Sequence, residues 1–240
     1  KDILSEIIAN NDFEVDLQKQ AISIEQLQKV SMKFGFPLHE KSLSFFRFRY
    51  HCRILKRRSP SKGWIKQEAR PEEIVPSYVT AGASALSILT DENSLEEAED
   101  IRTARPLVDI PIIRKDFIID EYQLYQAKIV GADAVLLIAA ALEQGKCQEL
   151  AEQAHELGLE VLLEIHSTEE LPYINSQIDM VGINNRNLGT FYTDVENSFR
   201  LAGQLPLNTV LVSESGISDP EVVKRLRTAD SGDSLSEKHL

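Results

Sequence analysis

Polar and charged side chains follow several apolar segments of this sequence, at the point where each segment ends. They are Lys56, Arg114, Lys115, Asp116, Glu164, His166, Asn184, Asn185, Arg186, Glu214, Ser215 and Gly216. A lysine near other cations can act as a general acid, and a glutamate in an apolar mouth has a raised pKa and can exchange protons with it. Arginine and the backbone N–H groups of a Ser-Gly turn before a helix suit a carboxylate or a phosphate. The pattern predicts proton transfer on an anionic substrate.

Each of these residues also has a plain structural explanation. A lysine at a strand end is usually only solvated, and the segments SESG and SPSKG can be simple turns. His166 either touches a substrate or only ends its strand. Polar groups at the ends of five strands on one face are, however, hard to explain as solvated surface.

The segments that carry these residues alternate with predicted helices. Strands are expected at 84–89, 110–116, 134–140, 160–166, 180–186 and 210–216, and helices at 71–82, 120–131, 142–158 and from Asp219 onward. Asp120 is expected to cap a helix, and Gly131 and Gly158 to end helices. Near-continuous Val, Ile and Leu strands that alternate with helices predict a parallel sheet, and no dinucleotide-binding motif is present. We therefore predict an α/β fold, a (β/α)8 TIM barrel, with its active site at the C-terminal ends of the strands.

The chain, residues 1–240, is predicted to be a single TIM-barrel domain. Residues 1–45 are expected to form an N-terminal helical extension, 46–229 the barrel and 230–240 an aberrant tail. The extension contains KDILSEIIANN and SIEQLQKVSMKF, which both have helical spacing.

Composition narrows the class of partner. The net charge of −12 and the isoelectric point near 4.9 argue against a general nucleic-acid binder. Cys52 and Cys147 lie far apart and indicate neither a disulfide framework nor a metal site, so a reducing, cytoplasmic location is expected. No apolar run approaches the about 18 residues of a membrane span, and no secretory leader opens the chain. The expected partner is a small molecule.

Several segments, in this order, resemble indole-3-glycerol phosphate synthase, a family of tryptophan biosynthesis. They are KRRSPSKG, PIIRKDFIIDEYQ, ADAVLLIAA, LEVLLEIHS, GINNRNLGTF and LVSESGI, and the likeness covers roughly residues 56–229. The resemblance implies a barrel without metal or organic cofactor. Such an enzyme closes 1-(2-carboxyphenylamino)-1-deoxyribulose 5-phosphate to indole-3-glycerol phosphate, with loss of carbon dioxide and water. Association with other enzymes of the tryptophan pathway is a further expectation.

The resemblance also implies a role for each candidate residue. Lys115 would be the general acid on the substrate carbonyl, Glu164 its proton-trading partner in dehydration, and Lys56 an electrostatic assistant. The other positions would bind substrate: Ser59 in a turn, Phe117 at the aromatic ring, Asn184 and Arg186 at hydroxyl and anionic groups, and Glu214, Ser215 and Gly216 at the phosphate end.

Three stretches depart from the family pattern, and each fits a shifted reading frame. The family reads IIAEFKRRSPSKG around Lys56, with a catalytic glutamate where this chain has Ile54. RYHCRI can be encoded CGG TAT CAT TGC CGA ATT, which one base later reads Gly-Ile-Ile-Ala-Glu. NSLEEA and DSGDSLSEKHL likewise yield the loop after the second strand, and the eighth strand with its phosphate-binding turn. We predict frameshifted segments, in the gene or through insertion and deletion errors in the sequence, and a truncated C-terminus.

The barrel is therefore expected to be incomplete, with an altered first strand and without its eighth strand and last helix. Loss of a positioned acid–base group typically lowers a rate by about 10²–10⁴, so activity is expected far below that of the family. Three alternatives stay open: a diverged, shorter barrel; a catalytically dead remnant; and another phosphate-binding barrel such as phosphoribosylanthranilate isomerase. The set Lys115, Glu164 and Asn184 argues against the isomerase, which is expected to use a Cys/Asp pair.

Overall fold

The structure is a computed structural model, and it describes most of the chain. The described residues are 3–34, 50–55, 58–59, 63–64, 70–90, 94–190, 192–206, 209–217, 219, 221–222, 224–225 and 233–236. Lys56 lies outside these ranges, and for Ile54 and Ser59 only the backbone is described.

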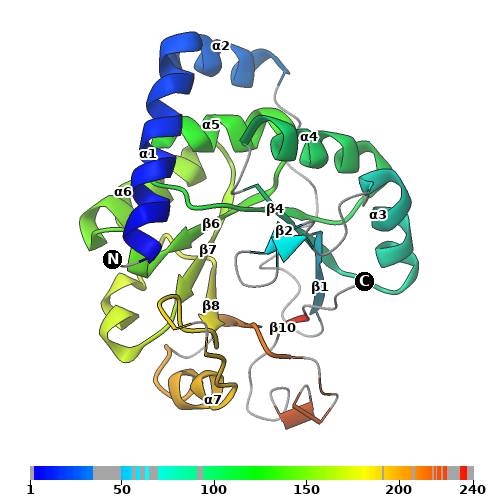
Figure 1. Cartoon of the computed structure of the whole chain (residues 1–240), viewed down its shortest axis with the longest axis vertical. Coiled ribbons are helices and arrows are strands. Elements are labelled where there is room, and N and C mark those ends of the chain that lie inside the picture. The colour runs from blue at the N-terminus through cyan, green and yellow to red at the C-terminus, as the bar shows by residue number, and fades with distance from the viewer. Residues whose placement is uncertain are drawn as a thin grey trace.

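The described strands form a closed parallel barrel in the order β1-β10-β9-β8-β7-β6-β5-β4 (Figure 1). The strands are β1 (Tyr50–Leu55), β4 (Ala85–Leu89), β5 (Ile112–Lys115), β6 (Ala134–Ile138), β7 (Glu160–Ile165), β8 (Met180–Asn184), β9 (Val210–Glu214) and β10 (Asp233–Ser236). A separate antiparallel pair joins β2 (Arg58–Ser59) to β3 (Gly63–Trp64). The six strands from β4 to β9 are consecutive in both sequence and space, as βα repeats require. The predicted α/β barrel fold is confirmed.

Helices surround this barrel on the outside (Figure 1). They are α1 (Ile3–Ala21), α2 (Ile24–Phe34), α3 (Pro71–Thr80), α4 (Ser94–Ala104), α5 (Glu121–Val130), α6 (Gln144–Glu156) and α7 (Glu196–Ala202), with the 3-10 turns η1 (Arg105–Leu107), η2 (Ala139–Ala141) and η3 (Thr168–Tyr173). Asp120 forms a capping box with Gln123 at the start of α5, and Gly131 ends that helix in the left-handed conformation. Both predicted helix signals are confirmed. No helix in the described part of the chain is long and apolar enough to cross a membrane.

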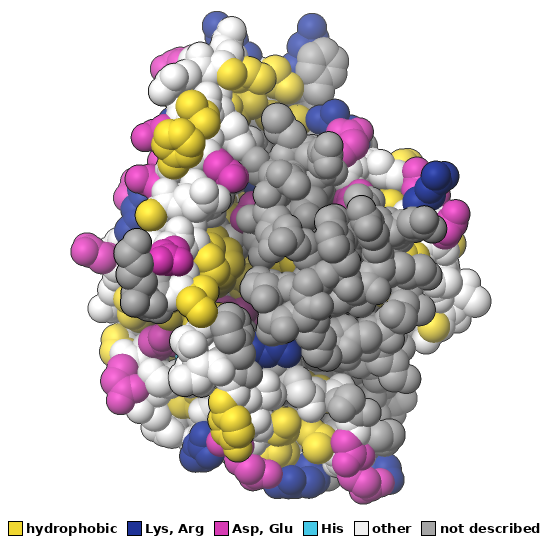
Figure 2. Space-filling view, viewed as in Figure 1, with side chains coloured by type: hydrophobic (Ala, Val, Ile, Leu, Met, Phe, Trp, Pro, Cys, Tyr) yellow, Lys and Arg dark blue, Asp and Glu magenta, His cyan; other side chains and the backbone are white. Residues whose placement is uncertain are grey.

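The two N-terminal helices dock on α5. Val15 and Leu27 form a buried cluster with Tyr122, whose hydroxyl donates to the carbonyl oxygens of Gln18 and Ile22. The hydrophobic side chains Phe13, Leu17 and Met32 of these helices are exposed, as is Ile22 between them. Figure 2 shows hydrophobic side chains over the same two helices.

The eighth strand, which the sequence predicted to be missing, is present in a short form. Strand β10 pairs with β1 at four positions, from Tyr50 with Asp233 to Arg53 with Ser236, but with β9 at only two positions. Parallel pairing uses backbone N–H and C=O groups, so the polar segment DSLS can occupy the place without the apolar pattern of a barrel strand. The altered first strand likewise pairs with β4 at four positions. Only four residues of the chain follow Ser236, and they lie outside the described part.

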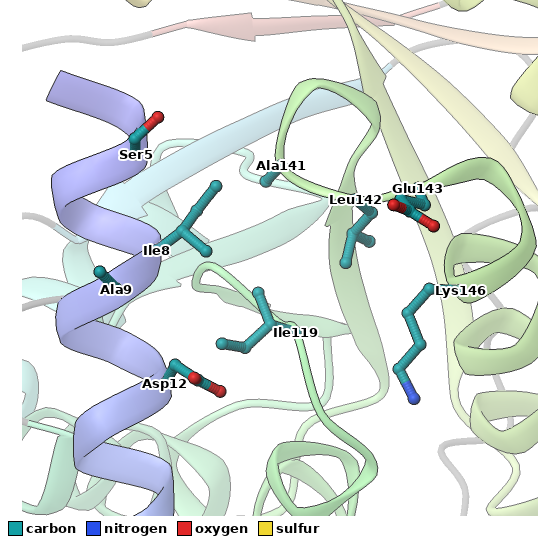
Figure 3. A pocket seen from close by; sticks show the side chains of 9 residues that line it. All are labelled: Ser5, Ile8, Ala9, Asp12, Ile119, Ala141, Leu142, Glu143 and Lys146. Carbon is teal, nitrogen blue, oxygen red and sulfur yellow. The ribbon is translucent and has the colours of Figure 1, made fainter. Parts of the chain in front are cut away.

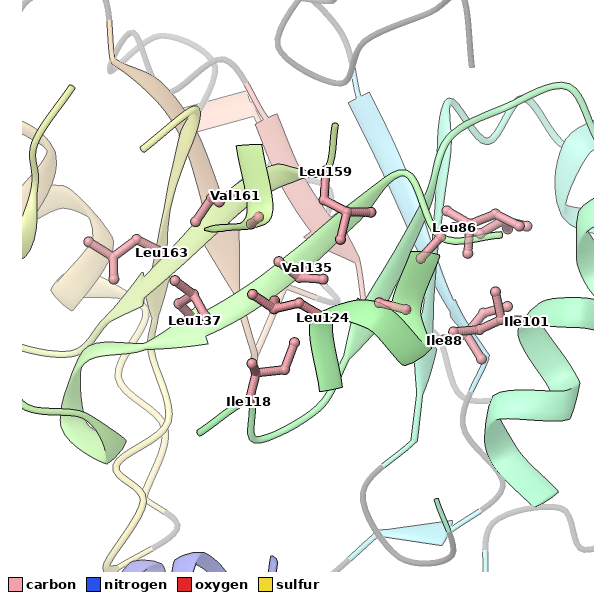
Figure 4. Packing of buried hydrophobic residues seen from close by; sticks show 14 of the residues in the cluster. Leu86, Ile88, Ile101, Ile118, Leu124, Val135, Leu137, Leu159, Val161 and Leu163 are labelled. Carbon is pink, nitrogen blue, oxygen red and sulfur yellow. The ribbon is translucent and has the colours of Figure 1, made fainter. Parts of the chain in front are cut away.

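The core has two layers that follow the strand alternation. One layer lies between strands and helices and includes Leu86, Val135 and Val161 (Figure 4). The other fills the barrel with residues such as Ile113 and Leu162. Because side chains alternate along a strand, each inward residue marks the next inward position two residues further on.

Candidate active site

Alternation places four of the predicted site residues inside the barrel, at the C-terminal ends of their strands. Ile113, Leu162, Met180 and Val212 point into the barrel. Lys115, Glu164 and Glu214 lie two residues after Ile113, Leu162 and Val212, and Asn184 lies four residues after Met180. Three of the four are almost fully buried: Glu164 is 2%, Asn184 8% and Glu214 1% exposed. The prediction that several strand ends converge on one mouth is correct for these residues.

Lys115 lies between two carboxylates. Its Nζ is 2.7 Å from Oε2 of Glu214 and 3.9 Å from Oε2 of Glu164. The sequence analysis expected other cations beside this lysine, but its described ionic partners are anions. Two neighbouring carboxylates favour the protonated, charged form of this lysine.

Glu164 is held from the opposite side. Asn184 donates from Nδ2 to Oε1 of Glu164 at 3.0 Å, and Nε2 of His166 lies 3.2 Å from the same oxygen. Burial alone would raise the pKa of Glu164, but the contact with His166, the charge of Lys115 and the bond from Asn184 outweigh it and lower the pKa below its ordinary value. The predicted raised pKa of Glu164 is therefore wrong, because the prediction considered only the apolar surroundings.

Glu214 has the raised pKa instead. Burial and the negative charge of Glu164 raise it above the ordinary value, against the opposing effect of Lys115. Oε1 of Glu214 is buried and has no hydrogen-bond partner among the described residues. Gly182 makes room for this carboxylate, since a Cβ there would lie 2.5 Å from Oε1 of Glu214. The resemblance implied a place at the phosphate end, and the structure places Glu214 in direct contact with Lys115.

The residues after β9 form a turn with unusual backbone angles. Ser215 has φ 66° and Gly216 has φ 75°. Asn185 donates to the carbonyl oxygen of Ser215 at 3.1 Å, and a Cβ on Gly216 would lie 2.6 Å from Thr193 Cγ2. Turns of this kind can present successive backbone N–H groups to an anion. The phosphate role of Ser215 and Gly216 stays a prediction that this geometry allows.

Two other predicted substrate contacts, Arg186 and Phe117, follow strands that end at this mouth. The backbone N–H of Arg186 donates to Oδ1 of Asn184 at 3.0 Å. This bond holds the backbone of Arg186 beside Asn184. Phe117 follows β5 and packs against the apolar cluster inside the barrel, and its carbonyl oxygen accepts from Gln123 and Asn11. Ser59 lies in β2, and its side chain is outside the described part, as is all of Lys56.

Arg114 and Asp116 do not join the mouth. Arg114, which is 0% exposed, contacts Asp116 at 2.7 Å and donates to the Gln123 carbonyl oxygen at 2.8 Å and to Thr90. Because they alternate with Lys115, they face the helices. Their assignment to the mouth is wrong, and the period of two along a strand could have excluded it.

His166 and Glu170 are functional candidates that the sequence analysis missed or left undecided. Nδ1 of His166 lies 3.6 Å from Oε2 of Glu170, and the backbone N–H of His166 donates to that oxygen at 2.6 Å. The available signal was the spacing in EIHSTEE, which puts Glu164 and Glu170 two and four residues from the histidine.

A separate open cavity of about 550 Å³ lies beside the barrel mouth, between α1 and the segment that joins η2 to α6 (Figure 3). Ile8, Ile119 and Leu142 point into it, and Asp12 and Lys146 lie at one edge. None of the predicted site residues lines this cavity. The chemistry therefore belongs to the mouth, where the ionisable groups converge, and not to this cavity.

Comparison with known proteins matches the chain to one family. The family model described as indole-3-glycerol phosphate synthase matches residues 4–235. A relative of that name from Bacteroides thetaiotaomicron is 77% identical over 238 residues, which covers 95% of this chain and 88% of the relative. Another of that name, from Neisseria gonorrhoeae, is 42% identical over 234 residues, covering 94% and 89%.

Solved structures with little sequence identity share the fold alone. The tryptophan synthase alpha subunit of Legionella pneumophila superposes with a TM-score of 0.59 at 16% identity, covering 87% of this chain and 85% of that one. The 3-keto-L-gulonate-6-phosphate decarboxylase of Vibrio cholerae gives 0.60 at 14% identity, covering 79% and 88%.

Proposed function

The chain belongs to the indole-3-glycerol phosphate synthase family, and we propose that it catalyses the reaction of that family. The substrate is 1-(2-carboxyphenylamino)-1-deoxyribulose 5-phosphate, and the products are indole-3-glycerol phosphate, carbon dioxide and water. The reaction is a carbon–carbon lyase step of tryptophan biosynthesis. The observation that carries the proposal is the contact of Lys115 with Glu164 and Glu214 in the barrel mouth.

Ring closure needs a proton at the substrate carbonyl. Lys115 is the partly exposed member of the cluster, with 20% of its side chain accessible, so its ammonium group is the donor that faces the mouth. As the aromatic ring carbon bonds to the carbonyl carbon, Lys115 gives a proton to the carbonyl oxygen, which becomes a hydroxyl group. Carbon dioxide then leaves that ring carbon, and the bonding pair it leaves behind restores the aromatic ring.

Dehydration needs both an acid and a base. Lys115, once Glu214 has returned a proton to it, protonates the hydroxyl group, which leaves as water. The neighbouring position of the substrate gives up a proton to Oε2 of Glu164. Asn184 and His166 hold the other oxygen of Glu164, so the free oxygen keeps a fixed direction. Glu214, whose pKa is raised, can return a proton to Lys115 across 2.7 Å.

Substrate anions need separate partners. We assign the anionic and hydroxyl groups to Arg186 and Asn184, the phosphate to the turn at Ser215 and Gly216, and the aromatic ring to Phe117. The turn supports this assignment by its backbone angles, and Phe117 by its position against the apolar interior of the barrel. Association with other enzymes of tryptophan biosynthesis and a cytoplasmic location stay predictions.

The test is turnover of the substrate by the purified chain, followed by the fluorescence of the indole product. We expect measurable but low activity, because the family's first-strand glutamate is replaced by Ile54. Restoring it with Ile54→Glu should raise kcat/KM, by up to about 10²–10⁴ if one acid–base group is regained. The backbone of β1 places position 54 in register with Ser87 of β4.

Two outcomes would contradict the proposal. A folded chain that makes no indole product, with or without Ile54→Glu, would indicate the catalytically dead remnant. Turnover of phosphoribosylanthranilate without any indole product would indicate the isomerase. Normal family activity in the unmodified chain would leave the function intact but would show that the position of Ile54 does not limit the rate.

A further inference from the structure

His166 lies between two carboxylates, and one of them is the Glu164 of the proposed reaction. It follows β7 directly, and its side chain is 14% exposed, with one ring nitrogen toward each of two carboxylates. Nε2 is 3.2 Å from Oε1 of Glu164, and Nδ1 is 3.6 Å from Oε2 of Glu170. Neither ring nitrogen makes a hydrogen bond of good geometry within the described residues, so the contacts are those of ion pairs.

This arrangement fixes the charge of the ring. A neutral imidazole has one protonated and one bare nitrogen, and the bare nitrogen would face a carboxylate oxygen lone pair to lone pair. Only the imidazolium can offer a proton to both Glu164 and Glu170. The two carboxylates raise the pKa of His166 to about 10, although burial opposes them.

The backbone holds this histidine in place. Its N–H donates to Glu170 at 2.6 Å, and its carbonyl oxygen accepts from Nδ2 of Asn197 at 2.9 Å. The ring is therefore attached to a peptide anchored from both η3 and α7. Such anchoring suits a group that must hold a neighbour in one direction.

We propose that His166 is a positioning residue, a fixed cation between Glu164 and Glu170 that keeps Glu164 ionised and directs its Oε2 toward the substrate. The inference rests on the proposed function, in which Glu164 is the proton acceptor. It explains how that acceptor stays ionised and oriented. His166 and Asn184 hold Oε1 of Glu164, whereas Oε2 faces Lys115 at 3.9 Å. Within the described part of the chain, the other charged groups beside the pair are Glu214, from β9, and Glu170, from η3.

His166→Gln tests the charge separately from the volume, because the amide can still donate to Glu164 but carries no charge. We expect kcat to fall roughly 10- to 100-fold, because Glu164 loses its cationic neighbour, with KM little changed. The acidic limb of the kcat/KM profile should move to higher pH, because Glu164 without a cationic neighbour takes up a proton sooner. A residue that only stabilised the fold would leave that limb in place.

The chain offers a matched control. His155 lies 2.8 Å from Asp179, a carboxylate that also accepts from the backbone of Val161 at the opposite end of the barrel. His155→Gln removes a histidine–carboxylate pair of similar length, and the acidic limb should stay unchanged. Equal shifts in both variants, or no shift in His166→Gln, would overturn the proposal.

A second measurement does not depend on activity. The five histidines can be titrated by NMR in the unmodified chain, with His166→Gln to identify the signal of His166. We expect that ring to stay protonated through pH 8 and to titrate lower in Glu164→Gln. Titration near the ordinary pKa would overturn the inference. Absence of turnover would refute the proposed function alone, and the titration would still decide whether His166 is a cation.

Discussion

Two buried ion networks occupy opposite ends of the barrel, and they differ in how completely their atoms are paired. At the N-terminal end, Arg105 contacts Asp133 at 2.6 Å and donates to the carbonyl oxygens of Gly131, Val108 and Ile110. The Asp133 oxygen also accepts from the backbone of Ile112 at 2.8 Å. One cation meets one carboxylate, and the same guanidinium group also donates to three carbonyl oxygens.

At the C-terminal end, carboxylates outnumber the lysine. Glu164 and Glu214 both face Lys115, and one oxygen of Glu214 has no hydrogen-bond partner in the described part of the chain. Burial of groups that are not fully paired costs stability, and perturbed titration of this kind is typical of functional sites. We interpret the difference as a division of roles. The network at the N-terminal end, the lower network, stabilises the barrel, and the network at the C-terminal end, the upper network, serves the proposed proton transfer.

The largest expected effect is on turnover when the upper cation is removed. Lys115→Met should lower kcat by about 10²–10⁴, because the carbonyl loses its proton donor. The free energy of unfolding should change little, since Glu214, whose pKa is already raised, can take up a proton instead of staying as an unpaired anion. Steady-state kinetics measure the change in kcat, and denaturant unfolding measures the change in unfolding free energy. A variant that unfolds but keeps its turnover when folded would reverse the assignment.

The corresponding change in the lower network should act on stability instead. Arg105→Met leaves Asp133 buried beside an uncharged side chain and leaves three carbonyl oxygens without their donor. Breaking a buried pair in this way costs about 3–5 kcal/mol of unfolding free energy. The kcat of the folded fraction should stay within a few-fold of the unmodified chain. Unchanged unfolding in urea would remove the contrast between the two ends.

A smaller effect is expected from Gly182, on the wall beside Glu214. Gly182→Ala puts a methyl group 2.5 Å from the present position of Glu214 Oε1, so the carboxylate must move away from Lys115. We expect kcat to fall roughly tenfold, about the effect of 1.4 kcal/mol on a barrier. The matched control is Gly145→Ala in α6, where nothing lies within 4 Å and where alanine should stabilise the helix slightly. Equal kinetics in the two variants would show that the contact of Glu214 does not matter.

The sequence predicted the barrel because its strands are short Val, Ile and Leu runs bounded by helix signals such as Asp120 and Gly131. It also brought Lys115, Glu164 and Asn184 together, since parallel strands end on one face. Arg114 and Asp116 were misplaced because the whole strand end was treated as one surface, although neighbouring residues on a strand face opposite sides. Strand β10 could not be foreseen from hydrophobicity, because its pairing is carried by the backbone.

Protonation within the mouth could not be predicted from residue types. Two glutamates at equivalent strand ends have pKa values moved in opposite directions. Glu164 has His166 and Asn184 as additional partners that lower its pKa, whereas burial and the charge of Glu164 raise the pKa of Glu214. Such a difference depends on contacts between strands, which cannot be predicted from the sequence of any one strand. The sequence could predict which candidate acid–base residues lie together, but not which of them keeps the proton.

The smallest expected effect tests that proton on Glu214. A carboxyl group whose pKa is raised on folding gives stability that is present below its ordinary pKa and is lost as pH rises through the folded value. The unmodified chain should therefore lose stability relative to Glu214→Gln between about pH 5 and pH 8, where the amide does not titrate. Each kcal/mol of difference should appear as about 2–4 °C in the melting temperature. Glu164→Gln should show the opposite trend, because the pKa of Glu164 is lowered and its contribution is lost as pH falls. Parallel melting curves for both variants would mean that the two carboxylates titrate alike, and the upper network would then resemble the lower one.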